Sequence, residues 1–322
     1  MDEMMMLIEA EPSPTFVETP QIAQIAERAQ SYLQCGFPIH FSGPSGVGKT
    51  TLALHVAARW GRPIALLFGD EQQSSSDLVG GMSGYRRHWL MDNFIRSVLK
   101  TEDELTQRWT DSRVTRACQQ GLTLVYDEFT RSRPEANNML LSVLEEGVLA
   151  MPAIRGGAGY VEVHPSFRAI FTSNPKEYAG VHATQDALYD RLVTLTMDYY
   201  DQDTEVAIVQ AKTGLGAEEA GCVVRLVREM RDKAGSAPSL RAGIVIGRML
   251  RLHDTRADAG NGLFRQVCID VLASSNGRAE SKAILEKALK RCRWKKGSGI
   301  ETAAVQTAAV QTAAQEGNGN GT

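Results

Sequence analysis

A glycine-rich loop between two apolar segments is the feature that most constrains how this chain can fold. Residues 41–54 read FSGPSGVGKTTLAL, which contains the pattern G-x-x-x-x-G-K-[ST]. In that pattern the glycines let backbone N–H groups surround phosphate oxygens, and the loop opens a helix whose N-terminus attracts anions. A strand-like segment precedes the loop and a helix-like segment follows it, as the motif requires. The sequence therefore predicts a nucleoside triphosphate site at Gly43, Pro44, Ser45, Gly46, Val47, Gly48, Lys49, Thr50 and Thr51.

Two adjacent carboxylates end a second apolar segment, LVYDEF at 124–129. Asp127, at a strand's end, is suited to hold magnesium together with the hydroxyl of Thr50, while Lys49 reaches the β- and γ-phosphates. Glu128, one residue on, is placed to orient or deprotonate an attacking water. Without the upstream loop, a pair of surface carboxylates would be the simpler interpretation. With the loop present, the pair predicts Mg²⁺-dependent hydrolysis of the triphosphate.

Three further polar residues occupy positions that such a site can use. Asn174 ends the apolar segment FTSN and can hold the attacking water, although Asn before Pro is also an ordinary turn signal. Arg191 opens the last strand of the predicted sheet, where it could reach a neighbouring subunit's nucleotide or pair with Asp190 or Asp186. Arg241, in PSLRAG, could contact the γ-phosphate of its own subunit or lie in solvent at a helix start.

The pattern of apolar segments predicts an α/β fold. Helix-like segments separate the apolar runs, which is typical of a parallel sheet covered by helices. Residues 132–147 predict a helix, with Pro134 in its first turn and Gly147 at its end. The segments on either side of RGGAG predict a β-hairpin with a basic tip at 155–159. The five predicted strands lie within 37–43, 63–69, 121–129, 167–175 and 191–198.

The order of these patterns predicts the domain organisation. An extended arm with three prolines occupies residues 1–20, and an α/β nucleotide-binding domain follows at 21–200, with the hairpin inserted near 148–165. Only helical patterns follow, and they predict a small all-α lid domain at 201–296. The tail at 297–322 is rich in Ala, Gln and Gly, and its TAAVQ repeat has a period that suits neither helix nor strand. We expect this tail to be disordered.

Composition argues against several other classes of protein. Lys plus Arg number 35 and Asp plus Glu 38, a formal net charge of −3, which gives no whole-chain attraction to nucleic acid. No segment approaches the ~20 apolar residues of a membrane span. The 5 cysteines include no close pair of the zinc or redox kind, and the 6 histidines show no metal-ligand spacing. We therefore expect a cytoplasmic protein with reduced thiols and no metal beyond magnesium.

Taken in order, GPSGVGKT, LVYDEF, FTSN, YDRL and PSLRA resemble the Walker A, Walker B, sensor 1, arginine finger and sensor 2 motifs of AAA+ ATPases. The helix and hairpin after the second motif are similar to the MoxR branch. Within that branch the chain resembles the CbbQ/NirQ/NorQ/GvpN family, and its gas vesicle GvpN members in particular. The segments that carry this resemblance lie at 69–81, 127–147 and 164–182, and the resemblance covers roughly residues 20–295.

This resemblance implies a P-loop NTPase fold and a ring-forming, Mg²⁺-dependent ATPase, expected to be a hexamer, that binds ATP and remodels other proteins. Relatives of the GvpN kind serve gas vesicle assembly, which implies other gas vesicle proteins as clients and a cytoplasmic location beside the vesicles. By motif position the resemblance assigns water activation to Glu128, sensor 1 to Asn174 and sensor 2 to Arg241. It assigns the finger that acts in trans to Arg191.

Other interpretations stay open at this point. Arg131 or Arg133, just after the second motif, could take the role in trans instead of Arg191. A nucleotide-binding structural component of gas vesicles would need no turnover. GPSGVGKT alone resembles the loop of guanylate kinases, but the Asp–Glu pair, the chain length and the helical second domain argue against a small-molecule kinase. The net charge and the lack of a recognisable binding motif argue against a nucleic-acid motor.

Overall fold

The computed structural model describes residues 7–8, 13–89, 103–152, 159–175, 186–233, 238–273 and 278–291. Its centre is a six-stranded sheet in the order β1-β3-β6-β9-β2-β10. β1 pairs with β3 in the antiparallel direction, and the other pairs of this sheet are parallel. The predicted parallel sheet is confirmed, with β1 as an added edge strand. The strands are β1 (Leu7–Ile8), β2 (Ile39–Ser42), β3 (Ile64–Phe68), β6 (Thr123–Asp127), β9 (Arg168–Ser173) and β10 (Val193–Thr196).

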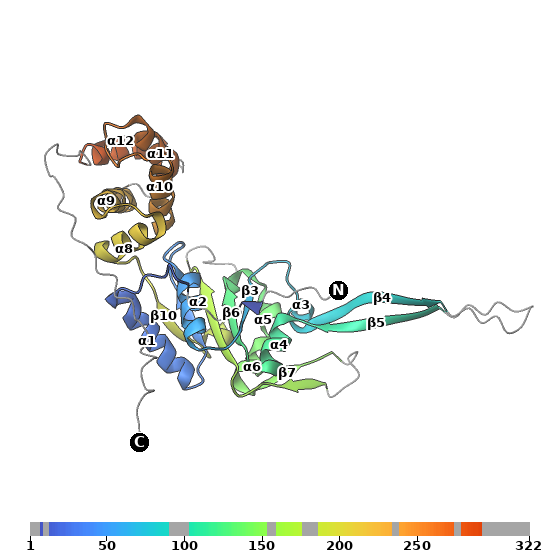
Figure 1. Ribbon diagram of the computed structural model, residues 1–322. Helices are drawn as coiled ribbons and strands as arrows, with labels where there is room; N and C mark the ends of the chain where they lie inside the picture. The colour runs from blue at the N-terminus through green and yellow to red at the C-terminus, as the bar shows by residue number, and fades with distance from the viewer. Residues whose placement is uncertain are drawn as a thin grey trace, which may run out of the picture.

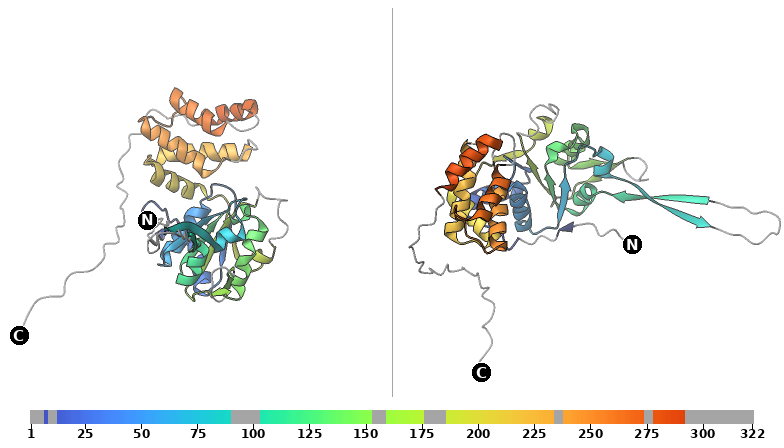
Figure 2. Two further views of the ribbon diagram at one scale, coloured as in Figure 1. Left: turned by 90° about the vertical axis from the view of Figure 1, so that its right-hand side faces the viewer. Right: turned by 90° about the horizontal axis from the view of Figure 1, so that it is seen from above.

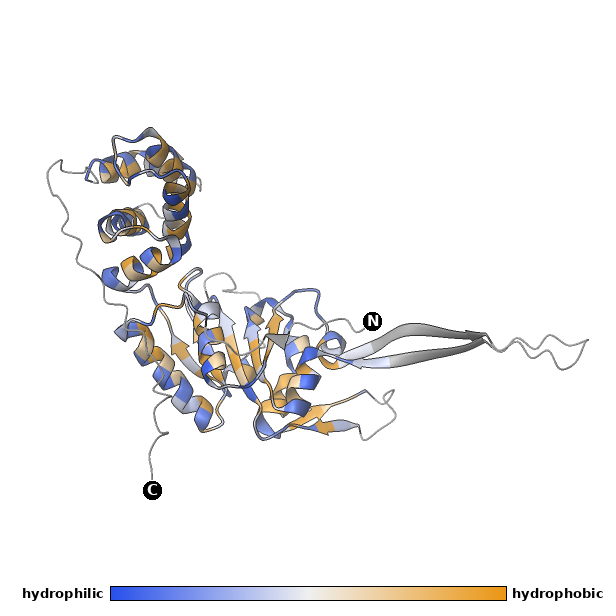
Figure 3. Ribbon diagram, in the orientation of Figure 1, coloured by the Kyte–Doolittle hydropathy of each residue, from blue (hydrophilic) through white to orange (hydrophobic). Residues whose placement is uncertain are grey.

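Helices cover both faces of this sheet (Figure 1). α1 (Pro20–Gln34) and α2 (Lys49–Arg59) lie on one face, where their apolar side chains share a buried cluster with β2. α4 (Arg113–Gln120) and α6 (Met139–Glu145) contribute to the cluster on the other face. Figure 3 shows hydrophobic residues concentrated in the strands between these layers. Strands buried on both faces account for the apolar runs without alternation in the sequence.

The single helix predicted at 132–147 is divided in the structure. A 3-10 turn, η1 (Phe129–Arg131), and α5 (Pro134–Asn137) precede α6, and Asn138 lies between α5 and α6. The Asn137 side chain accepts a hydrogen bond from the Tyr126 hydroxyl at 3.0 Å and donates to the Phe129 carbonyl at 3.2 Å. These contacts tie the first turn to the end of β6, which explains the break.

Two antiparallel hairpins extend from the sheet domain. α3 (Ser75–Val79) leads into β4 (Gly80–Trp89), which pairs with β5 (Asp103–Asp111) as a long ribbon that projects from the body (Figures 1 and 2). The sequence reasoning did not predict this ribbon. β7 (Val148–Ala150) and β8 (Tyr160–Glu162) form the second hairpin, and of its expected basic tip at 155–159 only Gly159 lies within the described residues.

The C-terminal part is helical, as the sequence indicates. Its helices share one buried apolar cluster and lie beside the sheet domain, next to α2 (Figure 1). The predicted tail at 297–322 lies outside the described residues, as do 1–6 and 9–12 of the arm. None of the described helices combines the length and the apolarity that crossing a membrane would need. The helices are α8 (Gln202–Thr213), α9 (Ala217–Lys233), α10 (Leu240–Leu252), α11 (Gly262–Leu272), α12 (Arg278–Leu289) and, in the sheet domain, α7 (Asp186–Tyr189).

Candidate nucleotide site

The loop between β2 and α2 is shaped by its glycines. Gly46 and Gly48 have φ angles of 78° and 92°, in the left-handed region that residues with side chains disfavour. A Cβ at Gly43 would lie 2.3 Å from the carbonyl oxygen of Met197, just after β10. The loop therefore leaves β2 in close contact with the segment that follows β10. It then turns into the N-terminus of α2. The first N–H groups of that helix have no partner within the helix and can bind phosphate.

Lys49 is the first residue of α2 and is nearly buried, at 7% exposure. Its Nζ donates hydrogen bonds to the carbonyl oxygens of Gly43 at 2.9 Å and Pro44 at 2.8 Å. The ammonium group is thereby held across the loop, where phosphate oxygens can also accept its hydrogen bonds.

Asp127, at the end of β6, is held by two hydroxyl groups. Thr50 Oγ1 donates to Asp127 Oδ1 at 2.6 Å, and Thr172 Oγ1 donates to the same oxygen at 2.5 Å. Magnesium is commonly held by one or two such oxygen groups together with water and substrate phosphates. The Thr50 hydroxyl and the Asp127 carboxylate fit that requirement. The described residues contain no cluster of three or more His, Cys, Asp or Glu that could hold a metal without a substrate.

Glu128 adopts an unusual backbone conformation beside the cavity. Its φ is 51°, and its N–H donates to Thr172 Oγ1 at 2.9 Å. The side chain forms an ion pair with Arg131 at 3.1 Å. A Cβ at Gly69 would lie 2.1 Å from the Glu128 carbonyl oxygen, so only glycine lets the end of β3 approach so closely. Contacts with the end of β3 on one side and with β9 on the other therefore hold Glu128 in this left-handed conformation.

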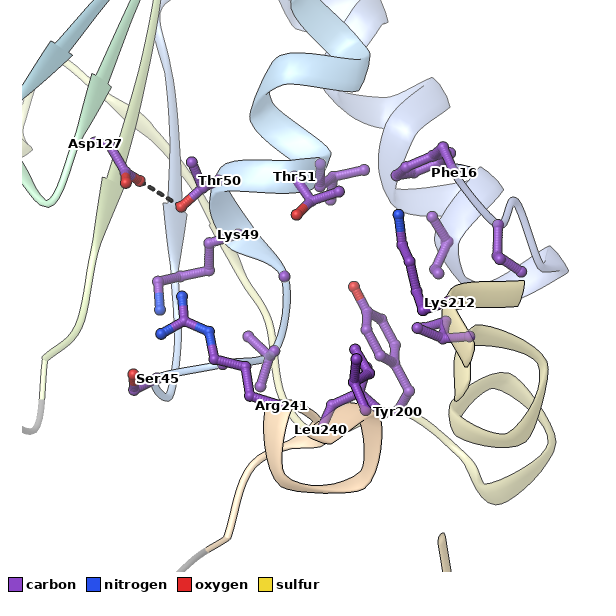
Figure 4. Close-up of a pocket in the computed structure, with 18 of the residues that line it drawn as sticks. Phe16, Ser45, Lys49, Thr50, Thr51, Asp127, Tyr200, Lys212, Leu240 and Arg241 are labelled. Carbon is purple, nitrogen blue, oxygen red and sulfur yellow. Dashed lines mark hydrogen bonds between the residues drawn. The ribbon is translucent and has the colours of Figure 1, made fainter. Parts of the chain in front are cut away.

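These groups converge on a cavity of about 260 Å³ (Figure 4). We call the part formed by the glycine-rich loop, Asp127 and Glu128 the phosphate end. We call the part formed by the N-terminal arm, Tyr200 and α8 the outer end. A nucleotide with its phosphates on the loop would place its base at the outer end, where the walls are mainly apolar. The lining residues outside the loop are Phe16, Val17, Ile22, Leu52, Asp127, Glu128, Tyr200, Ile208, Lys212, Leu240, Arg241 and Ile244.

The outer end joins three elements that are distant in the sequence. The Phe16 ring stacks on the His55 ring of α2, with centroids 3.7 Å apart. Lys212 Nζ, from α8, donates to Thr15 Oγ1 at 2.7 Å. Burial raises the pKa of Tyr200 to about 12, so its hydroxyl remains neutral where it faces the cavity. The arm is thus fastened both to the sheet domain and to the helical domain.

The start of α10 brings the helical domain onto the phosphate end. A Cβ at Gly46 would lie 2.3 Å from Ser239 Oγ, so the loop and the N-cap of α10 touch. Arg241 lines the cavity with Lys49 and Asp127, and Figure 4 shows its guanidinium directed toward Lys49. The sequence left open whether Arg241 contacts the γ-phosphate of its own subunit or lies in solvent. Its position in the cavity lining favours the first arrangement.

Asn174 lies at the end of β9, buried at 5% exposure and two residues beyond Thr172. It does not belong to the cavity lining itself. The preceding residue, Ser173, makes a hydrogen bond of 2.8 Å with Nε2 of His40, whose Nδ1 contacts Thr194 Oγ1 at 3.0 Å. Burial, and to a lesser extent the charge of Lys49, lower the pKa of His40 to about 4. The neutral imidazole therefore joins β2 to β10 and to the end of β9, just before Asn174.

Arg191 lies away from the cavity of its own chain. Its Nε and Nη2 donate to one carboxylate oxygen of Glu145, the first at 2.8 Å, and its Nη1 donates to the Ala187 carbonyl at 2.6 Å. This pair replaces the pairing with Asp186 or Asp190 that the sequence suggested. Arg131, the alternative finger, contacts Glu128, while Arg133 is exposed at the start of α5.

Sequence reasoning missed several contributors to this cavity. Thr172 is two residues before Asn174 on a strand, so its side chain points to the same face, and period-2 alternation would have identified it. Ser239 directly precedes α10, the helix of Arg241, and could have been recognised from the sequence as its N-cap. Phe16, Tyr200 and Lys212 carry no motif, because their place depends on how the arm and α8 pack.

Several known proteins resemble this chain in sequence or in fold. Residues 38–192 match the model of the AAA domain (dynein-related subfamily). The chain is 48% identical to the gas vesicle ATPase GvpN of Ancylobacter aquaticus over 84% of this chain and 78% of the relative. It is 45% identical to the gas vesicle ATPase GvpN of Haloferax mediterranei, over 80% and 74%. NtrX from Brucella abortus in complex with ADP shares the fold, with a TM-score of 0.52 at 16% identity over 86% of this chain and 61% of that chain.

Proposed function

Since the chain belongs to the GvpN family of gas vesicle ATPases and is itself an AAA ATPase, we propose that Mg²⁺-dependent ATP hydrolysis by this protein drives protein remodelling during gas vesicle assembly. One observation carries the catalytic part of the proposal. A phosphate-binding loop, an adjacent Asp–Glu pair and an arginine of the helical domain line the same cavity. A protein that only binds nucleotide has no need for Glu128 beside Asp127 or for a lid arginine at the phosphates.

The residues have distinct roles in the proposed reaction. Lys49 and the loop amides bind phosphate oxygens, and Arg241 approaches the terminal phosphate from the lid. Magnesium held by Thr50 and, through water, by Asp127 would neutralise charge on the phosphates. Glu128 orients the attacking water and accepts its proton on a carboxylate oxygen. Asn174 would hold the same water from the end of β9.

In a ring of subunits, Arg191 of one subunit would reach the nucleotide of its neighbour. Arg191 is bound to the exposed carboxylate of Glu145 rather than to its own cavity. Exposed ion pairs contribute only ~0–1 kcal/mol, so Arg191 can exchange Glu145 for a phosphate of the adjacent subunit at little cost. A planar guanidinium suits the charge that develops during phosphoryl transfer. We extend the proposal to a homo-oligomeric ring, a hexamer by family resemblance.

Mixing two inactive variants tests this arrangement. Lys49→Ala subunits bind ATP only weakly but can still donate Arg191, whereas Arg191→Ala subunits bind nucleotide but lack the finger. The mixture is expected to hydrolyse ATP faster than the sum of its parts, and EDTA should abolish this activity. Arg131→Ala and Arg133→Ala mixed with Lys49→Ala are the matched controls. Restoration in one of those mixtures, and not with Arg191→Ala, would transfer the role to that arginine.

Gas vesicle production in cells tests the biological part. Cys35 and Cys118 are free thiols, which fits the proposed cytoplasmic location beside the vesicles. Cells that carry Glu128→Gln should bind nucleotide yet fail to form normal vesicles. Normal vesicles in Glu128→Gln and Lys49→Ala cells alike would instead support a structural component that needs no turnover.

A further inference from the structure

A buried ion cluster lies at the junction between the sheet domain and the helical domain. Glu205 of α8 is only 2% exposed, and its two carboxylate oxygens accept hydrogen bonds from Arg228 at 3.1 Å and Arg231 at 2.9 Å. Both arginines belong to α9. Arg231 is itself nearly buried, at 8% side-chain exposure, and its guanidinium carbon lies 3.8 Å from the centre of the Tyr199 ring.

The same arginines hold two backbone segments that form the cavity. Arg228 Nη1 donates to the Tyr200 carbonyl at 2.9 Å, and the Tyr200 side chain lines the cavity. Arg231 Nε donates to the Pro238 carbonyl at 3.2 Å. Pro238 is followed by Ser239, which touches the glycine-rich loop at Gly46, and then by Leu240 and Arg241 of the lining. One ion cluster is therefore bonded to two backbone segments that carry lining residues of the cavity.

Stability alone does not account for this arrangement. Burying charges removes them from water, and apolar side chains of similar size often serve a domain core equally well. Arg231 Nη2 is buried and has no hydrogen-bond partner among the described residues, which is a further cost. A guanidinium is nevertheless suited to this position, because its planar fork can bind Glu205 and Pro238 at once while it stacks on Tyr199.

We propose that the Glu205–Arg231 pair is a positioning element that fixes Arg241 at the terminal phosphate and thereby couples the orientation of the helical domain to turnover. Arg231 does not line the cavity, and it acts through the Pro238 carbonyl and the start of α10. This inference rests on the proposed hydrolytic function and adds a residue to it that no motif identifies.

The Arg231→Lys variant tests the proposal in the full chain, because lysine keeps the charge but cannot bind Glu205 and Pro238 in one fixed geometry. We expect kcat to fall about tenfold, since small displacements of a group at the reacting centre are costly. ADP affinity should change less than kcat, because Lys49 and the loop still bind its phosphates. Arg265→Lys, which alters the exposed pair with Glu286 in the same domain, is the matched control and should leave kcat unchanged.

A double-mutant cycle separates positioning from general destabilisation. If Arg231 acts through Arg241, Arg231→Lys should cause no further loss of kcat in an Arg241→Ala background. Losses that multiply in the double variant, or an unchanged kcat in Arg231→Lys, would overturn the proposal. The same cycle can be measured on the affinity ratio between a nonhydrolysable ATP analogue and ADP. That ratio tests the inference even if the wild-type chain shows no turnover, a result that would contradict the proposed function instead.

Tyr199→Leu covers the case in which Arg231→Lys unfolds the helical domain. It removes the ring beneath the guanidinium and leaves every charge in place. We expect kcat to fall in Tyr199→Leu, but by less than in Arg231→Lys. This fall should again be absent in an Arg241→Ala background. A Tyr199→Leu variant that behaves like Arg265→Lys in both backgrounds would overturn the proposal.

Discussion

At the phosphate end of the cavity, Thr50, Asp127 and Thr172 hold one another through hydrogen bonds of 2.5 and 2.6 Å. At the outer end, a half-buried Phe16 stacks on His55, and an exposed Thr15 accepts one hydrogen bond from Lys212. The first set comes from the first turn of α2 and from two adjacent strands, β6 and β9. The second set joins an arm, a helix of the sheet domain and a helix of the lid.

This difference indicates that the two ends of the cavity have different roles. Polar groups that bond one another across two strands of a rigid sheet and the adjoining helix keep fixed positions, as transition-state stabilisation requires. Apolar contacts between separate elements stabilise a bound ligand but tolerate small shifts. Changes at the phosphate end should therefore alter turnover or charge recognition, whereas changes at the outer end should alter affinity with little effect on kcat.

Glu128→Gln should produce the largest effect and separates chemistry from binding. The amide keeps the size of the side chain but cannot accept the proton of the attacking water, so kcat should fall ~10²- to 10⁴-fold. ATP affinity should stay near the wild-type value, because Glu128 does not bind the phosphates. Steady-state hydrolysis and equilibrium binding measure the two quantities. Glu135→Gln, an exposed residue of α5, is the control; an equal loss of affinity in Glu128→Gln would contradict the assigned role.

Lys49→Ala should produce the next largest effect, and on affinity. A hydrogen bond to a charged group contributes ~1.5–3 kcal/mol, which corresponds to about a 10- to 150-fold loss of ATP affinity. The loss should be greater for ATP than for AMP, because Lys49 reaches the β- and γ-phosphates. Titration with both nucleotides measures the ratio, and Lys233→Ala on the exposed end of α9 is the control. Equal losses for ATP and AMP would mean that Lys49 supports the loop rather than the phosphates.

The division between the two ends also explains how much the sequence could predict. Lys49 belongs to a local loop motif, and Asp127 and Glu128 follow directly on one apolar strand. Residue type and spacing therefore suffice to identify all three. Phe16 and Tyr200 are ordinary apolar or aromatic residues whose contact arises only after two domains pack. The β4–β5 ribbon was not predicted because no motif marks the pairing of these two strands.

Phe16→Ala tests the outer end directly. The ring stacks on His55 and covers part of the cavity, so its loss should weaken nucleotide binding by about 1 kcal/mol, or roughly fivefold. Because the phosphate end is unchanged, kcat at saturating ATP should remain near the wild-type value. Phe37→Ala, which removes an exposed ring outside the cavity, is the matched control. A fall in kcat without a change in affinity would contradict the separation of the two ends.

Thr15→Val should produce the smallest effect, and it tests whether the arm is fastened through polar contact or through packing. The substitution preserves the shape of the side chain and removes the acceptor of the Lys212 hydrogen bond, an exposed contact of 2.7 Å. An exposed bond of this kind contributes ~0.5 kcal/mol, so nucleotide affinity should fall only about twofold. Thr15→Ser keeps the hydroxyl and should bind like the wild type in the same titration. A larger loss in Thr15→Val than in Phe16→Ala would show that the Lys212 bond, rather than the ring stack, joins the arm to the cavity. The outer end would then depend on polar contact, as the phosphate end does.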